Sequence, residues 1–318
     1  MIALMGCGHM GFQVALVRTH QRLTETQIQG DRMLFITDKV AIIDVDGMLV
    51  NRQKRGLMHA GENPVSLFIE KLDKAARDKS VKAVVLRINS PGGTVAASDI
   101  MYHHLRQFKL RTGKPVIACV LGLGCSGAYY LACGCDGIVA QPSSVTGSIG
   151  TIMQTFSVAG TMEKIGVKAV AVKSGRMKDM ASPLHDLSDE ERDVLQGIID
   201  NFYQQFLGIV EDGRKTIDKQ KLQELADGRV FTAEQALQEG LIDRIGYLED
   251  GIEWAKQKAG LQRPRVVIYH RPSGYKPNAY GLASANAEGL EPLINVELPD
   301  WLSAGSPQFL YLWQPSVE

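Results

Sequence analysis

The chain has 318 residues, 45% of them hydrophobic and 22% charged, and its formal net charge is zero. This length fits one large α/β domain or two ordinary domains. The balanced charge and the lack of a long basic run argue against a nucleic-acid partner. The cysteine count is odd, at five, and four cysteines fall in segments expected to be buried, so we expect neither a disulfide framework nor a metal site or cofactor.

The N-terminal segment, residues 1–17, has no charged side chain. Residues 6–11 read Gly-x-Gly-x-x-Gly, a pattern of dinucleotide sites when a helix and an acidic residue follow at the right distance. The later segments do not continue as a nucleotide-binding domain, which disfavours that interpretation. The run is slightly shorter than the ~18 apolar residues of a membrane-spanning helix. We therefore predict a weak or truncated membrane anchor within residues 1–35.

Two successive strand-to-helix units follow. In the first, residues 40–45 and 47–50 predict short strands, and Asn63 followed by proline predicts the start of a helix over 64–78. Residues 81–88 form an apolar run that predicts a strand, and Asn-Ser-Pro-Gly-Gly-Thr leads from it into a helix over 95–110.

In the second unit, residues 116–123 predict a buried strand, and the small residues after it predict a helix to about residue 133. Ser126 lies at the junction, where its hydroxyl is accessible beside the free N–H groups of a helix start. Such groups can stabilise the oxyanion of a tetrahedral intermediate. If the two strands are parallel neighbours, both glycine turns share one sheet edge, and the Gly93 N–H becomes a second candidate donor. Gly-x-Ser-Gly taken alone also fits a simple tight turn.

The third part of the chain contains the other two polar candidate site residues, Ser148 and Lys178. Residues 138–140 predict a strand, 141–150 a loop containing Ser148, and 161–166 a short helix. Residues 168–172 predict a strand that leads to Lys178. Helices are predicted over 186–212, 219–226 and 251–259, and residues 261–318 are expected to be mostly irregular. The apolar residues 309–313 are expected to pack on the core or on a neighbouring subunit.

Four ordered motifs carry a family resemblance: Asn-Ser-Pro-Gly-Gly, Gly-x-x-Ser-Gly-Ala-Tyr-Tyr-Leu-Ala, Thr-Gly-Ser-Ile-Gly and Lys-Ser-Gly-x-x-Lys-Asp-x-x-Ser-Pro. In order and spacing they resemble the signal peptide peptidase A (protease IV) family of serine proteases. The resemblance implies an α/β fold of the Clp protease and crotonase superfamily, with repeated β-β-α units and a C-terminal helical region. It implies Ser126 as nucleophile, Lys178 as general base, Ser148 as hydrogen-bond partner of the lysine, and oxyanion N–H groups from Gly93 and Gly127.

A lysine base must be neutral when it acts, although an ordinary lysine has a pKa of about 10.4. Apolar surroundings lower that pKa. Lys164 and Lys173 are competing bases, and a histidine triad would have to use His103, His104 or His185. Two further alternatives are an acyl-CoA enzyme that uses only the glycine N–H groups and a catalytically silent scaffold that forms rings.

The resemblance also implies a homo-oligomer with a peptide substrate, such as a released signal peptide, and in some family members one site combines the serine and lysine of different subunits. We predict membrane association with the catalytic domain outside the cytoplasm, and a cytoplasmic location is the alternative. The chain divides into the segment 1–35, a peptidase domain over 36–260 and an extension over 261–318.

Overall fold

The computed structural model describes residues 22–30, 37–52, 62–271 and 308–313. The dinucleotide pattern and the uncharged run over residues 1–17, which carries the anchor prediction, lie outside these residues. Within the described ranges, every helix is too short or too polar to cross a membrane.

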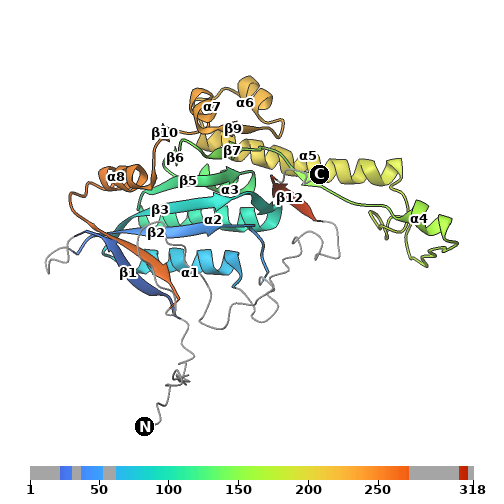
Figure 1. The fold of residues 1–318 in the computed structure, drawn as a ribbon, viewed down its shortest axis with the longest axis horizontal. Helices are drawn as coiled ribbons and strands as arrows, with labels where there is room; N and C mark the ends of the chain where they lie inside the picture. The colour runs from blue at the N-terminus through green and yellow to red at the C-terminus, as the bar shows by residue number, and fades with distance from the viewer. Residues whose placement is uncertain (1–21, 31–36, 53–61, 272–307, 314–318) are drawn as a thin grey trace, which may run out of the picture.

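A mixed, mostly parallel β-sheet forms the body of the molecule (Figure 1). The central strands are almost completely buried because helices cover both faces, as is typical of parallel sheets. In spatial order the strands are β1 (Thr24–Gln29), β11 (Arg265–His270), β2 (Lys39–Asp46), β3 (Val81–Ser90), β5 (Val116–Cys125), β6 (Ile138–Ala140) and β10 (Arg244–Ile245). Strand β7 (Val145–Gly147) pairs with β5 and with β9 (Val230–Thr232).

Two helices, α1 (Pro64–Arg77) and α2 (Val95–Thr112), cover one face of the sheet, and α8 (Leu248–Lys258) covers the other (Figure 1). The predicted cap of α1 is confirmed, since Asn63 Oδ1 accepts hydrogen bonds from the Val65 and Ser66 amides. Strand β3 enters a tight glycine turn before α2, and β5 enters another before α3 (Gly127–Ala132). The two strands are parallel neighbours, so both turns lie at one edge of the sheet.

The chain after β7 leaves the body as an arm, which we define as residues 154–188. The arm contains α4 (Ala159–Lys164) and extends away from the sheet together with the beginning of α5 (Asp189–Gly213) (Figure 1). Ser188 and Glu191 form a capping box that starts α5. Helices α6 (Lys219–Leu225) and α7 (Ala233–Gln238) then return to the body.

A second, three-stranded sheet borders the glycine turns. It consists of β4 (Gly92–Thr94), β12 (Phe309–Leu312) and β8 (Ile152–Met153), with β12 antiparallel to both neighbours. Strand β12 therefore brings the C-terminal part of the chain to the sheet edge at which Ser126 lies.

Three expectations differ from the structure. Residues 168–172 form no strand, because nothing in the described part of the chain pairs with them. Residues 265–270 and 309–312 were expected to be irregular but are strands, because β11 inserts between β1 and β2 and β12 inserts between β4 and β8. The division into 1–35, 36–260 and 261–318 stays a prediction.

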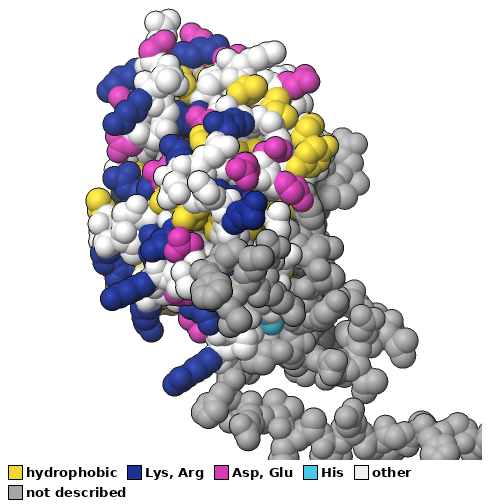
Figure 2. All heavy atoms as spheres, turned by 90° about the vertical axis from the view of Figure 1, so that its left-hand side faces the viewer, with side chains coloured by type: hydrophobic (Ala, Val, Ile, Leu, Met, Phe, Trp, Pro, Cys, Tyr) yellow, Lys and Arg dark blue, Asp and Glu magenta, His cyan; other side chains and the backbone are white. Residues whose placement is uncertain are grey.

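Basic and acidic side chains are intermixed on the face that Figure 2 shows, with small patches of hydrophobic side chains between them. This mixture agrees with the formal net charge of zero. The four described cysteines lie in or near the core.

Candidate active site

Ser126 lies on a strained turn between β5 and α3. Its φ is 52° and its ψ is −117°, a backbone conformation that non-glycine residues rarely adopt. The turn is held from both sides, since the Ser126 amide donates to the Gly147 carbonyl at 2.7 Å and its carbonyl accepts from the Tyr130 amide at 2.8 Å. Strain of this kind persists only where the surrounding structure imposes it, and it is common for catalytic serines on strand-to-helix turns.

The hydroxyl of Ser126 is buried, and the side chain is 1% exposed. Its Oγ has no hydrogen-bond partner in the described part of the chain. A buried hydroxyl without a partner is unfavourable for stability alone, so it requires an explanation, such as a catalytic role. The neighbouring Cys125 is a poor alternative nucleophile, because burial raises the pKa of its thiol to about 12.

Three glycines surround the Ser126 turn at distances that exclude side chains. A Cβ on Gly92, whose φ is +102°, would lie 2.8 Å from the Gly127 amide nitrogen. A Cβ on Gly93 would lie 2.0 Å from the Leu49 carbonyl oxygen, and one on Gly127 would lie 2.2 Å from Ser98 Oγ. The two predicted oxyanion donors, Gly93 and Gly127, thus belong to turns that pack directly against each other.

Ser148 lies beside the nucleophile turn. The residue before it, Gly147, accepts the hydrogen bond from the Ser126 amide, and the Ser148 amide donates to the Arg229 carbonyl at 2.8 Å. Ser148 is buried and has a φ of 51°, which makes it a second strained serine at the same edge. The fold thus brings Ser148, Ser126 and the glycine turns together.

Lys178, by contrast, lies on the arm and is exposed to solvent. Its amide donates to the Gly175 carbonyl in a short turn, and the arm extends away from the body that holds Ser126 (Figure 1). Ser126 Oγ has no hydrogen bond to it. Within one chain, the fold therefore does not bring the predicted nucleophile and base together.

The histidines offer no replacement base within the described residues. His103 and His104 lie on α2 with their rings in contact with each other, at 5.6 Å between centroids. His185 lies on the arm, where its ring nitrogens contact the Asp186 and Asp179 carbonyls. None of the three is a hydrogen-bond partner of Ser126 Oγ.

One cluster on the arm contains groups that could hold a metal ion: Asp179, His185 and Glu191. Both carboxylates already have partners. Asp179 pairs with Lys173, and Glu191 accepts from the Ser188 amide as part of the α5 cap. Lys173 lowers the pKa of the Asp179 carboxyl, and the Ser188 amide lowers that of Glu191. The cluster is therefore explained as an ion pair and a helix cap.

The expectation that residues 309–313 pack on the core is confirmed by Tyr311, and sequence reasoning missed only that these residues form a strand next to Gly93. The Tyr311 ring is buried between two aromatic rings, at 5.3 Å from Tyr130 and 4.8 Å from Phe206 between centroids. The only sequence signal was the apolar run over residues 309–313.

A buried serine on a strained strand-to-helix turn, bordered by two glycine turns on an α/β sheet, defines a serine peptidase with a Clp protease-like fold. Comparison with known proteins agrees. The family model described as peptidase family S49 matches residues 109–262, and the Clp protease model matches residues 43–146.

Several relatives carry protease names. A protein from Enterococcus faecium assigned the name signal peptide peptidase SppA is 34% identical over 80% of this chain and 73% of its own length. A protein from Synechocystis named as a protease is 37% identical over 72% of this chain and 78% of its own length. Protease 4 of Haemophilus influenzae is 30% identical over 86% of this chain and 43% of its own length.

The chain thus belongs to peptidase family S49, the signal peptide peptidase A family, and it is a serine endopeptidase that acts on peptides. The family assignment favours the peptidase interpretation over the acyl-CoA enzyme and the silent scaffold.

Proposed function

We propose that this peptidase uses a Ser–Lys dyad that two copies of the chain build together. Ser126 of one copy is the nucleophile, and Lys178 on the arm of a neighbouring copy is the general base. Ser148 orients the lysine, and the N–H groups of Gly93 and Gly127 stabilise the oxyanion. The enzyme is accordingly a homo-oligomer with closed rotational symmetry.

The observation that carries this proposal is the contrast between a nucleophile buried in the body and a base exposed on the arm. The arm is also unusually apolar for an exposed segment. Val170 and Val172 are 86% and 101% exposed, and α4 has no buried residue. Contiguous exposed apolar residues are typical of an interaction surface. A neighbouring copy would cover these residues and would also provide the apolar surroundings in which a lysine becomes neutral.

The roles of the residues follow from acyl-transfer chemistry. Lys178 removes the proton from Ser126 Oγ as it attacks the peptide carbonyl, and the same proton then passes to the leaving amine. The negative charge on the carbonyl oxygen is stabilised by N–H groups that the rigid glycine turns hold in place. Hydrolysis of the acyl-enzyme by water completes the cycle.

The substrates we propose are hydrophobic peptides such as released signal peptides. Relatives from several organisms carry the names signal peptide peptidase and protease 4, and these names support this substrate class. The membrane association predicted for residues 1–17, with the catalytic domain outside the cytoplasm, remains part of the proposal. Fractionation that recovers the full-length chain only from the soluble cytosol would contradict that part.

Subunit complementation tests the shared dyad. Chains with Ser126→Ala and chains with Lys178→Ala are each expected to be inactive, and co-expression of the two is expected to restore about a quarter of wild-type activity by random assembly. If both residues of one site came from one chain, the mixed oligomers would stay inactive. Co-expression of Ser126→Ala with the Ser126→Ala, Lys178→Ala double variant is the matched control and should also stay inactive.

A further inference from the structure

Ser148 has a strained backbone conformation that its neighbours must impose. Its φ of 51° lies in the left-handed region, which a serine adopts only at a cost in free energy. The residue before it, Gly147, ends β7, which pairs with both β5 and β9. The Ser148 amide itself donates to the Arg229 carbonyl at 2.8 Å. The position of Ser148 therefore depends on where the Arg229 carbonyl is held.

The Arg229 carbonyl belongs to a tight turn over residues 227–229, which one side chain closes. Asp227 Oδ1 accepts a hydrogen bond from the Arg229 amide at 3.0 Å. This is an Asx turn, in which an aspartate binds the backbone two residues further along. Gly228, between them, has a φ of +92°, which a glycine adopts without strain. Strands β7 and β9 have only three residues each, so the closed turn fixes the end of a short ladder.

The Arg229 side chain binds the same carboxylate a second time. Its Nε lies 2.8 Å from Asp227 Oδ1 and 2.9 Å from Oδ2, and a terminal nitrogen of the guanidinium pairs with Oδ2. The Arg229 guanidinium and amide lower the pKa of the Asp227 carboxyl to about 2. The carboxylate therefore stays ionised at every pH at which a lysine base could act. Because the pair is exposed, its contribution to stability is small, and its effect is to fix the geometry of the turn.

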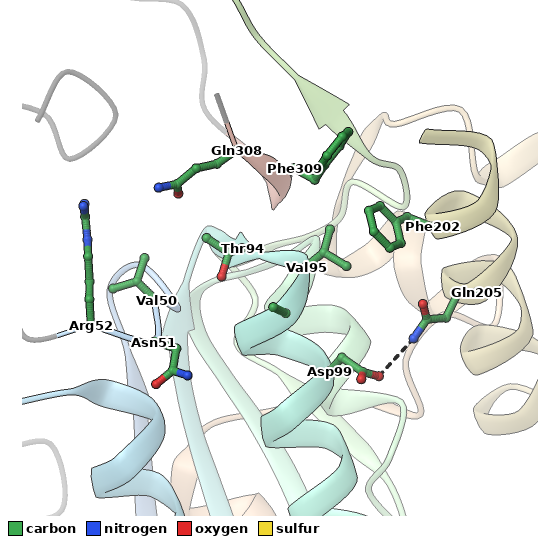
Figure 3. Close-up of a pocket in the computed structure, with 11 residues that line it drawn as sticks. Val50, Asn51, Arg52, Thr94, Val95, Asp99, Phe202, Gln205, Gln308 and Phe309 are labelled. Carbon is green, nitrogen blue, oxygen red and sulfur yellow. Dashed lines mark hydrogen bonds between the residues drawn. The ribbon is translucent and has the colours of Figure 1, made fainter. Parts of the chain in front are cut away.

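The turn is also attached to α5. The Tyr203 hydroxyl donates to the Ala226 carbonyl at 2.9 Å, directly before the turn. The same segment of α5 is bound to α2, since Gln205 Nε2 donates to Asp99 Oδ1 at 3.0 Å (Figure 3). These two side chains line a cleft of about 480 Å³ that β12 also borders. The turn therefore starts from a part of the chain that is fixed to the body.

Close packing joins this turn to the residues on both sides of Ser148. A Cβ on Gly147 would lie 2.6 Å from Cδ2 of the Phe231 ring and 3.3 Å from the Arg229 carbonyl oxygen. A Cβ on Gly150 would lie 3.6 Å from the Gly228 Cα. Movement of the turn would therefore displace the segment that contains Ser148.

We propose that Asp227 is a positioning residue for the active site, because it closes the 227–229 turn and so holds the Arg229 carbonyl and, through it, Ser148. This inference rests on the proposed function, in which Ser148 orients the general base. A displaced Ser148 leaves the lysine poorly aligned with Ser126 Oγ. Poor alignment slows the chemical step and leaves substrate binding unchanged.

The alternative is that residues 227–229 only reverse the chain before β9. Such a turn would need Asp227 and Gly228 for its own geometry and would be indifferent to Ser148. The two interpretations differ in what is lost when the turn opens. The alternative predicts a loss of stability alone, and our inference predicts a loss of kcat that depends on Ser148.

Two variants of Asp227 separate the geometry of the turn from its charge. Asp227→Asn keeps an oxygen that accepts from the Arg229 amide, so kcat should stay within about threefold of the wild type. Asp227→Glu keeps the charge, but its longer side chain cannot close the same turn, so kcat should fall about tenfold with KM nearly unchanged. A low kcat in Asp227→Asn together with a normal kcat in Asp227→Glu would overturn the inference, since the charge would then be the property that matters.

A double-mutant cycle tests whether Asp227 acts through Ser148. Asp227→Ala and Ser148→Ala should each lower kcat about tenfold, and the double variant should be no slower than Ser148→Ala alone, because the two changes interrupt one chain of contacts. Asp218→Ala is the matched control. The Asp218 carboxylate accepts from the Lys221 amide at 2.9 Å at the start of α6, so its removal deletes a similar hydrogen bond and should leave kcat unchanged.

The outcomes distinguish this inference from the proposed function. If the two losses in kcat multiply in the double variant, Asp227 does not act through Ser148, and the inference is wrong while the assigned role of Ser148 stands. If Ser148→Ala is as active as the wild type, the assigned role of Ser148 is wrong, and the inference fails with it. If Asp227→Ala folds poorly, Asp227→Glu in the Ser148→Ala chain completes the same cycle.

Discussion

The turn that carries Ser126 and the arm that carries Lys178 differ in how they are held. Hydrogen bonds to β7 and α3 fix the turn, and the neighbouring glycines pack so closely that no side chain would fit at their positions. The arm is held by local turns and exposed ion pairs, and its valines face solvent. In the proposed mechanism, this turn supplies the nucleophile and the oxyanion donors. The proposed base, Lys178, lies on the arm and makes no hydrogen bond to Ser126 Oγ in the described part of the chain.

The largest effect is expected on removal of the Ser126 hydroxyl, which tests the proposed role of the turn. Ser126→Ala should lower peptide hydrolysis by about 10⁴-fold or more, because it removes the nucleophile. The melting temperature should stay close to that of the wild type, since the hydroxyl has no hydrogen-bond partner to lose. Ser144→Ala is a matched control, because its Oγ is also buried without a partner. Full activity of the Ser126→Ala chain would contradict the assigned nucleophile.

Substitution of Lys178 tests whether the arm provides the general base. Lys178→Ala should lower activity by about 10³-fold or more, and Lys178→Arg should not restore it, because arginine stays protonated. Lys164→Ala, which removes an exposed lysine on α4, should have nearly wild-type kcat/KM. An active Lys178→Ala chain that loses activity on replacement of His103, His104 or His185 would favour a histidine base instead.

A smaller effect is expected from the exposed valines of the arm. Val170→Asp combined with Val172→Asp should lower the oligomer mass in light scattering and should reduce activity at least about tenfold, because a charge buried in an interface without a partner is unfavourable. Leu110→Asp, at an exposed leucine on α2, is the control and should leave the mass unchanged. An unchanged mass in the double variant would show that the arm is not the interface.

The smallest expected effect is a dependence of the arm on pH. The Asp186 and Asp179 carbonyls raise the pKa of His185 above its ordinary value, so the protonated ring stabilises the folded arm. This contribution is fully present below the unfolded pKa of about 6.5 and is lost as the pH rises through the raised folded pKa. Amide exchange over residues 178–191, corrected for intrinsic rates, should therefore increase severalfold between about pH 6 and pH 8.

The matched controls for this pH effect are two histidine variants. His185→Gln should remove the pH dependence of exchange in the arm, and His103→Gln, on the exposed side of α2, should leave it unchanged. A wild-type arm whose corrected exchange is the same at both pH values would contradict the role of His185.

The parts of the fold that sequence reasoning predicted well are those in which local pattern and tertiary packing agree. The apolar runs before Gly92 and Ser126 are buried strands, and Asn63 with Pro64 starts a helix. Glycines with positive φ or close contacts mark the turns at the site. The family resemblance also implied Ser148, which the fold brings beside the Ser126 turn.

The parts that were not predicted depend on distant or absent partners. Strand β11 is specified by its neighbours β1 and β2, more than 200 residues away, and a short run such as 265–270 carries no sign of that pairing. The same holds for β12. Residues 168–172 form a short apolar run rich in valine, which is typical of a strand, but backbone groups need a neighbouring strand, and none pairs with them within the described chain.

The covalent link between β12 and its cleft changes how strongly other peptides must bind. A ligand attached to its own receptor is present at an effective concentration of about 1 mM, whatever the concentration of the protein. A free peptide with the same intrinsic affinity must therefore reach about this concentration before it occupies half of the clefts. A peptide that paired with β4 would have to displace β12 first. Displacement would require a peptide that is concentrated locally or that makes better contacts than Phe309 and Tyr311 make with Phe202 and Tyr130.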